Sequence, residues 1–186
     1  LYPIPFYSGC IRPQLSLKYS QLQYANSSIL SKTLIDPSLK GMGTTVSLVT
    51  LARHMAFWGH VGDSRIYLYR DGEFTQISAD HTIVQVLLDK GKITEEEAID
   101  HPQRHVLTRA VGVDENLVVD SGAFEVQPKD RILICSDGLT SFIRKQELCD
   151  AIGDYRRTER EIINDLFARV YENGANDNVT AILTTI

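Results

Sequence analysis

The sequence from residue 41 to residue 70, GMGTTVSLVTLARHMAFWGHVGDSRIYLYR, decides what kind of fold the chain can adopt. Two runs rich in β-branched and aromatic residues lie back to back at 44–51 and 55–61, and the basic pair Arg53-His54 separates them. Such runs, bounded by turn-forming residues, are typical of β-strands. The second run ends at Gly62-Asp63, which puts a carboxylate at the end of a predicted buried strand. Because a charged side chain is costly to bury, this aspartate is a candidate for function.

Composition and charge exclude several classes of protein. The 186 residues suffice for one domain with a sizeable core, and 43% hydrophobic with 23% charged residues is typical of a globular protein. The formal net charge is -5 and the basic residues are scattered, which argues against a nucleic-acid partner. No apolar run approaches the roughly 20 residues that span a bilayer, and the apolar start lacks a signal-peptide pattern. We expect a cytoplasmic monomer with neither nucleic acid nor membrane as a partner.

The three cysteines, Cys10, Cys135 and Cys149, show no CxxC or Cys/His spacing. Their odd number argues against a disulfide framework or a zinc site and fits a reducing setting. Cys135 lies inside an apolar run, which favours a small core residue over a nucleophile. We find neither an internal repeat nor a linker, so residues 1–186 are predicted to form a single domain.

Strand patterns continue beyond the opening stretch. Residues 65–69 alternate, Asp71-Gly72 follows, and residues 73–77 resume the pattern, which is the strongest short-range signal for a β-hairpin. The middle of the chain is therefore predicted to be an antiparallel meander. Further strands are predicted at residues 117–124, 131–135 and 179–186.

Helical patterns separate these strand clusters. Apolar spacing and capping boxes predict helices at residues 16–32, 83–88, 94–99 and 145–152, and from 158 to Gly174. Asp36-Pro37 is expected to stop the first helix and Gly91 the second. Because the strands cluster as hairpins rather than alternating with helices, the predicted fold class is α+β, with antiparallel sheets covered by helices.

Three aspartates stand at predicted strand ends in turns rich in Gly or Asn: Asp63 in GDSR, Asp137 in SDGL and Asp177 in NDNVT. If the strands share neighbouring sheets, these carboxylates can converge, and their mutual repulsion then calls for a cation. Oxygen ligands without Cys or His favour Mg²⁺, Mn²⁺ or Ca²⁺ over Zn²⁺. The alternative, that each aspartate merely caps a turn, stays open.

Other candidate groups carry weaker signals. Gly41-Met42-Gly43 lacks the spacing of a nucleotide-binding loop, and neither Ser64 nor Ser136 lies in a GxSxG elbow. His60 falls within a predicted strand, which favours a hydrogen-bonded core histidine. His81, His101 and His105 lie around the helices predicted at 83–88 and 94–99, and for each of them solvent exposure is favoured over metal binding or pH sensing. Arg104 and Arg109 lie in the same part of the chain. They can bind an anionic ligand, or they can pair with the acidic run at 95–97.

Five motifs in order resemble one known family. They are GMGTT at 41–45, GHVGDSR at 59–65, DHTIVQVLLDKGKITEEEAIDHPQRHVLTRAVG at 80–112, ILICSDGL at 132–139 and GANDNVT at 174–180. Together they resemble the metal-dependent serine/threonine protein phosphatases of type 2C (PPM), and the segment with ITEEEA and HPQR resembles the bacterial branch most. The resemblance covers the chain from about Ser16 to its end.

The resemblance implies a sandwich of two antiparallel β-sheets flanked by helices (α-β-β-α). It also implies a centre of two Mn²⁺ or Mg²⁺ ions whose water hydrolyses phosphoserine or phosphothreonine in proteins phosphorylated by a serine/threonine kinase. Asp137 and Asp177 correspond to ligands of the first metal, and Asp63, together with Asp137, to ligands of a third metal in bacterial members. Residues 80–112 correspond to a flap that influences substrate choice.

The start of the chain departs from this family. An Arg-bearing strand, an Asn-Glu-Asp motif and Asp-Gly-Met-Gly-Gly, which supply the bridging aspartate and the second-metal ligands, are absent from the 186 residues. We therefore assign no catalytic residue and expect the amino-terminal part of the phosphatase domain to be incomplete. The alternatives are an inactive truncation and a pseudophosphatase that acts as a regulatory or binding domain.

Overall fold

The two apolar runs on either side of Arg53 form a β-hairpin in the computed structural model, which describes residues 12–175 and 177–186. Strands β1 (Val46–Ala52) and β2 (Met55–Val61) pair in antiparallel register from Val46 opposite Val61 to Ala52 opposite Met55. Strand β5 (Asp120–Glu125) adds to the other side of β2, so the sheet order is β1-β2-β5. The two strands predicted from the opening stretch are thus confirmed, and they pair with each other as a hairpin.

The described chain divides into two compact units. The first unit holds the described residues up to Asp63 together with residues 80–125, and the second holds residues 64–79 and 126–186. The single domain expected from the sequence stays a prediction. The proline-punctuated start, residues 1–11, lies outside the described residues.

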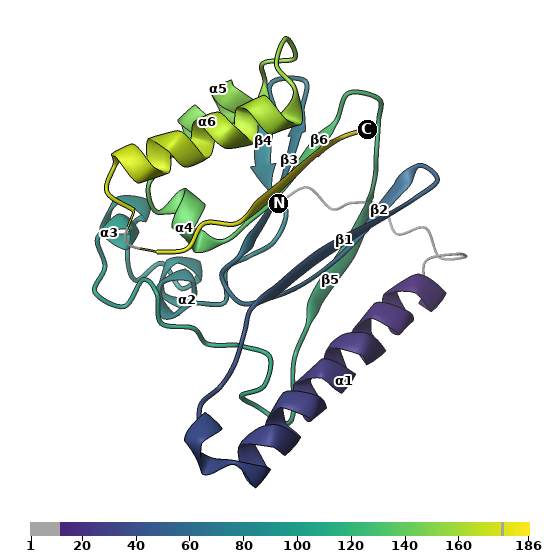
Figure 1. Cartoon of the computed structure of the whole chain (residues 1–186), viewed down its shortest axis with the longest axis vertical. Coiled ribbons are helices and arrows are strands. Elements are labelled where there is room, and N and C mark those ends of the chain that lie inside the picture. The colour runs from purple at the N-terminus through teal and green to yellow at the C-terminus, as the bar shows by residue number, and fades with distance from the viewer. Residues whose placement is uncertain (1–11, 176) are drawn as a thin grey trace. The chain divides into compact units, whose positions relative to one another are not determined.

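Helix α1 (Arg12–Ile35) belongs to the first unit and lies alongside its sheet (Figure 1). It starts four residues before the predicted helix. The proline at position 13 does not prevent this, because the N–H groups of a first helical turn have no intrahelical partner and a proline is tolerated there. Leu22 packs with buried Val61, Val111 and Leu117. The short 3₁₀-helix η1 (Pro37–Leu39) follows, capped by the Asp36 side chain.

Two amides of α1 bind backbone atoms of the loop that precedes β5. Gln23 Nε2 donates to the Leu117 carbonyl at 2.7 Å. Asn26 uses both ends of its amide, since Nδ2 donates to the Asp114 carbonyl at 2.7 Å and Oδ1 accepts from the Gly112 N–H at 2.6 Å. These bonds give three backbone groups of the loop a partner on α1.

Two short helices, α2 (Ile83–Asp89) and α3 (Glu95–Ile99), complete the first unit. The predicted capping box of α3 is present: the Thr94 N–H donates to the Glu97 carboxylate at 2.8 Å, and the Thr94 hydroxyl accepts from the Glu97 N–H at 3.3 Å. Gly91 follows α2 with φ of 61°, as expected for a residue that ends a helix.

The second unit contains a four-stranded antiparallel sheet in the order β4-β3-β6-β7. Its strands are β3 (Arg65–Arg70), β4 (Glu73–Gln76), β6 (Arg131–Cys135) and β7 (Ala181–Thr185). Asp71 and Gly72 join β3 to β4 with φ of 50° and 88°, and two positive φ values are what a type I′ hairpin turn requires.

The predicted continuous meander is wrong at one point. Strands β2 and β3 follow each other in sequence but belong to different sheets. Gly62 lies between them with φ of 113°, a conformation that residues with a Cβ rarely adopt, and a Cβ there would lie 2.3 Å from Thr45 Cγ2. The Gly62 carbonyl accepts from the His81 N–H at 2.7 Å, so the chain turns away from β2 instead of forming a hairpin with it.

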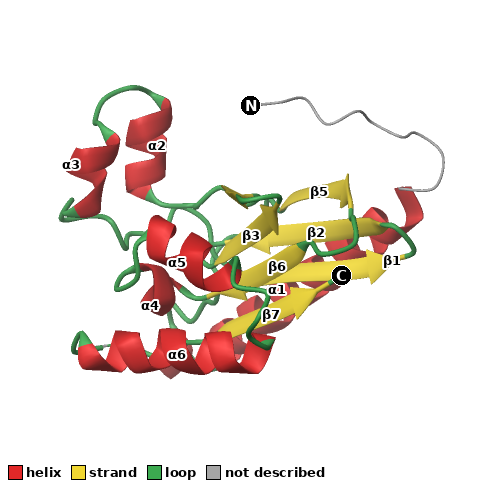
Figure 2. Ribbon diagram, turned by 90° about the horizontal axis from the view of Figure 1, so that it is seen from above, coloured by secondary structure: helices red, strands yellow, loops and turns green. Residues whose placement is uncertain are grey.

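Helices α4 (Asp137–Thr140), α5 (Lys145–Ile152) and α6 (Glu159–Glu172) pack on one face of this second sheet (Figure 2). Their shared core includes fully buried Leu133, Leu148, Ile162 and Leu166. Cys135 is also buried there, as predicted for a core residue.

The predicted fold class, α+β with antiparallel sheets and helices, is confirmed. Among the residues that the structure describes, no helix has the length and apolar character needed to cross a bilayer.

Candidate metal site and histidine network

Two of the three candidate aspartates lie at the same end of the second sheet. Asp137 follows the last residues of β6, and Asp177 precedes β7, the strand that pairs with β6. Beyond the strands the pairing continues, because the Ser136 N–H donates to the Thr180 carbonyl at 3.0 Å. The Thr180 N–H in turn donates to the Ser136 hydroxyl at 3.1 Å. The segments that carry the two carboxylates are therefore held side by side.

Gly138 permits a close approach of these two segments. It is buried in the first turn of α4, and a Cβ built on it would lie 2.4 Å from the carbonyl oxygen of Asn178. Any other residue would push the Asp137 turn away from the loop that carries Asp177. Close packing thus explains why a glycine follows Asp137 in the SDGL motif.

The two carboxylates differ in their surroundings. Asp137 is half-buried and is the first residue of α4. Asp177 is exposed, and its Oδ1 accepts from the Asn178 N–H at 2.7 Å. This local bond is the turn-capping role that the sequence left open, and it occupies one oxygen of the Asp177 carboxylate.

Asp63 is the last residue of the first of the two segments that make up the first unit, and it directly follows Gly62. It is half-buried in the turn after β2. The prediction that it is a ligand for an accessory metal stays a prediction.

The carboxylates described here do not make a complete metal site. Within residues 12–175 and 177–186, no group of three or more His, Cys, Asp or Glu side chains is arranged to hold a metal ion. Asp137 and Asp177 have the oxygen chemistry that Mn²⁺ and Mg²⁺ prefer, but hard cations in proteins take about six ligands. The chain's own residues therefore fit part of a two-metal centre, and no reaction step follows from them alone.

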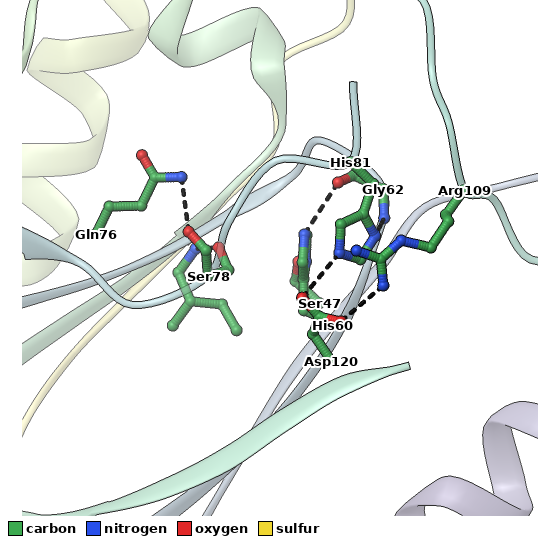
Figure 3. A network of polar contacts seen from close by, with 9 residues as sticks. Ser47, His60, Gly62, Gln76, Ser78, His81, Arg109 and Asp120 are labelled. Carbon is green, nitrogen blue, oxygen red and sulfur yellow. Dashed lines mark hydrogen bonds and ion pairs between the residues drawn. The ribbon is translucent and has the colours of Figure 1, made fainter. Parts of the chain in front are cut away.

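A network of two buried histidines holds the turn before Asp63 (Figure 3). His60, fully buried in β2, donates from Nε2 to the Gly62 carbonyl at 3.0 Å, and its Nδ1 accepts from the Ser47 hydroxyl at 2.8 Å. The carbonyl can only accept, which fixes the proton on Nε2. Burial lowers the pKa of His60 to about 4, and the nearby His81 ring adds to this effect. The predicted hydrogen-bonded core histidine is confirmed.

The prediction that His81 is solvent-exposed is wrong. Its residue is 2% exposed, and the ring lies 4.8 Å from the ring of His60. Nδ1 accepts from the Gly62 N–H at 3.1 Å, and Nε2 bonds to Asp120 Oδ2 at 3.1 Å. His105, in contrast, is exposed, and His101 is half-buried. Long-range contacts with β2 and β5 bury His81, and these have no local signature in the sequence.

Asp120 and Arg109 complete the network. Arg109 donates to Asp120 Oδ1 at 2.7 Å, so its protein partner is Asp120 and not the acidic run at 95–97. Burial raises the pKa of Asp120, but hydrogen bonds from His81 and Arg109 outweigh it and leave the pKa below its usual value. The sequence reasoning missed Asp120. Asp120 lies inside the strand predicted at 117–124, and no local signal marked it, because the pairing of His60 with Asp120 joins β2 to a strand far along the chain.

The family model described as Stage II sporulation protein E (SpoIIE) matches residues 44–186. A curated relative, the putative protein phosphatase 2C-type of Streptococcus pyogenes serotype M6, is 39% identical over 144 residues. That alignment covers 77% of this chain and 58% of the relative.

Solved structures agree with these matches. The crystal structure of the Mycobacterium tuberculosis serine/threonine phosphatase PstP/Ppp superposes with a TM-score of 0.80 at 38% identity, covering 87% of this chain and 67% of that one. The chain belongs to the PP2C-type serine/threonine phosphatase family. The family resemblance inferred from five motifs is thereby confirmed.

A second PP2C-type structure bears on the metal. The catalytic domain of the serine/threonine phosphatase PstP, solved in complex with two manganese ions, has a TM-score of 0.74 and 36% identity. The match covers 85% of this chain and 65% of that domain. Since this PP2C-type chain spans 58% of the streptococcal relative's length, the activity of a whole protein is a matter for proposal.

Proposed function

We propose that this chain is part of an enzyme that hydrolyses phosphoserine and phosphothreonine in proteins with the help of Mn²⁺ or Mg²⁺. The observation that carries the proposal is that the segments bearing Asp137 and Asp177 are held side by side at one sheet end of a PP2C-type chain. The manganese complex of PstP, a similar protein, supports the choice of metal.

In this proposal Asp137 and Asp177 hold the first metal, and Asp63 serves an accessory third one. Bound metal ions supply a water of lowered pKa and neutralise charge on the phosphoryl oxygens. The chain's own contribution is positional: the Ser136–Thr180 hydrogen bonds and the close approach at Gly138 keep the two carboxylate-bearing segments together. Less reorganisation is then needed when the metal binds.

Phosphorylated proteins, the products of a serine/threonine kinase, are the proposed substrates. The names of the PP2C-type relatives support this substrate class. The cytoplasmic location and the monomeric state stay predictions from the sequence.

A non-catalytic regulatory role is the second candidate. The two candidates differ in turnover: the enzyme releases phosphate from a phosphothreonine peptide, whereas the regulatory domain binds a partner without releasing it.

The test is hydrolysis of p-nitrophenyl phosphate and of a phosphothreonine peptide by the full-length protein. We expect activity only with Mn²⁺ or Mg²⁺, and we expect Asp137→Asn to abolish it. Asp150→Asn is the matched control, because Asp150 is exposed on α5 in the same unit and the charge change is the same. Full activity in excess chelator, or an unaffected Asp137→Asn variant, would contradict the metal mechanism.

A further inference from the structure

We propose that His81 is a positioning residue: its Nδ1 accepts a hydrogen bond from the Gly62 N–H and so sets the direction that the chain takes at Asp63, after the end of β2. The consequence for metal binding rests on the proposed function, in which Asp63 is a ligand. The structural part of the proposal, the control of the Gly62–Asp63 turn, stands on the contacts of the first unit alone.

The polar atoms of Gly62 are held from two sides by histidine. Its N–H donates to His81 Nδ1 at 3.1 Å. Its carbonyl accepts from the His81 N–H at 2.7 Å and from His60 Nε2 at 3.0 Å. This carbonyl belongs to the peptide unit that joins Gly62 to Asp63, so its orientation determines where the Asp63 backbone begins.

The backbone at Gly62 needs such support. Its φ of 113° is open to glycine, which is also the residue with the largest conformational freedom to lose on folding. Thr45 blocks any side chain at this position, since a Cβ would lie 2.3 Å from Thr45 Cγ2. The turn therefore combines a flexible residue with a fixed geometry, and the hydrogen bonds to His81 supply the restraint.

Only one form of the His81 ring can make these bonds. Nδ1 faces an N–H group and must be unprotonated, so the proton lies on Nε2 and is donated to Asp120 Oδ2 at 3.1 Å. Arg109 occupies the other Asp120 oxygen at 2.7 Å, which keeps the carboxylate oriented and ionised. Asp120 thus selects the tautomer of His81 that accepts from Gly62.

The ring stays neutral because of its surroundings. Burial lowers the pKa of His81, Arg109 acts in the same direction, and the carboxylates of Asp120 and Asp80 oppose the shift without reversing it. The ring of His60 also faces His81, at 4.8 Å between centroids. A proton on Nδ1 would point at the Gly62 N–H, so the neutral state and the turn geometry depend on each other.

Two variants of His81 in the full-length protein separate the roles of the two ring nitrogens. The amide oxygen of His81→Asn can stand near Nδ1 and accept from Gly62, whereas the longer amide of His81→Gln reaches the position of Nε2 and leaves the Gly62 N–H without its acceptor. His54→Gln is the matched control, because His54 is exposed in the β1–β2 turn of the same unit.

Amide hydrogen exchange at Gly62 is the first readout. We expect His81→Gln to exchange faster than the wild type by about tenfold or more, the loss of one hydrogen bond, and His81→Asn to recover most of the protection. Nitrogen-15 NMR of the wild-type ring should show an unprotonated Nδ1. A protonated Nδ1, unchanged exchange in His81→Gln, or equal loss of protection in both variants would overturn the proposal.

The Mn²⁺ concentration for half-maximal phosphatase activity is the second readout. We expect His81→Gln to raise it about 10- to 100-fold, as is typical when the support of a metal ligand is lost, with a smaller rise in His81→Asn. A wild-type protein without Mn²⁺-dependent activity would refute the proposed function, while the exchange and NMR measurements would still decide the role of His81.

Discussion

Ser136 and Thr180 hold the end of β6 against the start of β7 through two hydrogen bonds, one from the Ser136 N–H to the Thr180 carbonyl and one from the Thr180 N–H to the Ser136 hydroxyl. The serine hydroxyl also donates to the Asn178 carbonyl at 3.5 Å. Since Asp137 follows Ser136 and Asp177 precedes Asn178, one serine side chain helps to align both candidate ligands.

The first prediction concerns the close approach at Gly138. We expect Gly138→Ala to lower the free energy of unfolding by about 3 kcal/mol or more, because its Cβ would lie 2.4 Å from a backbone oxygen that cannot rotate away. Urea unfolding measures this. Gly174→Ala is the control: Gly174 has φ of 78° with nothing within 4 Å, so its cost is about 1 kcal/mol of backbone strain. Equal costs in the two variants would contradict the packing argument.

The second prediction concerns the buried Arg131, which is 3% exposed. Its guanidinium lies 4.3 Å from the Tyr155 ring and donates to Thr185 Oγ1 and to the carbonyls of Ile152, Asp154 and Arg157. A lysine keeps the charge but cannot reach all of these acceptors in a planar fork. We therefore expect Arg131→Lys to lower the free energy of unfolding by about 3 kcal/mol.

Arg156→Lys is the control for this variant. The Arg156 side chain is 90% exposed and pairs with Asp154. Because exposed ion pairs contribute little, we expect the free energy of unfolding to change by less than about 0.5 kcal/mol. A similar effect of both substitutions on the urea midpoint would show that the buried contacts of Arg131 do not matter.

The third prediction concerns pH and the buried His60. Its pKa is about 4 in the folded protein, below the 6.5 of a free histidine. The unfolded chain therefore binds more protons between these values, and stability falls as pH drops from 6.5 towards 4. The loss is on the order of 3 kcal/mol for His60, and His81 shifts in the same direction and adds to it.

Urea unfolding at a series of pH values measures this loss. We expect His60→Gln, which keeps a donor for the Gly62 carbonyl, to reduce the slope of stability against pH in that window. An unchanged slope in His60→Gln would show that other groups cause the acid sensitivity.

The fourth prediction concerns metal binding by residues 1–186. The described part of this chain offers Asp137 and Asp177 at one sheet end but no group of three or more candidate ligands. We expect calorimetry to give a weak Mn²⁺ affinity, with a dissociation constant of about 0.1–1 mM, and little turnover. Robust Mn²⁺-dependent hydrolysis by residues 1–186 would mean that a bridging ligand within them has been overlooked.

The local elements were largely predictable from the sequence. The runs at 55–61, 131–135 and 145–152 have the predicted bounds, because turn-forming residues or capping groups stand on both sides of each. What local patterns did not reveal was pairing between distant strands. The β2 edge pairs with β5, more than 50 residues later, and that choice depends on tertiary packing rather than on the strand sequence.

The candidate site was likewise predictable where it depends on local sequence, and not where it depends on long-range contacts. Asp137 and Asp177 were found because each stands next to a strand, and those strands turned out to be neighbours in one sheet. His81 was misjudged for the opposite reason. It lies outside any strand, and its burial results from bonds to Gly62 and Asp120, which are 19 and 39 positions away.

The amides of Gln23 and Asn26 hydrogen-bond to main-chain atoms of the loop before β5. Every residue offers a main-chain carbonyl, and every residue except proline an N–H, so most of that loop can change its side chains over evolution without losing these hydrogen bonds to α1. Gly112 is an exception, because a Cβ there would lie 2.3 Å from Ile29 Cγ2. We therefore expect few correlated substitutions between α1 and this loop among homologues, although these hydrogen bonds attach the helix to the loop.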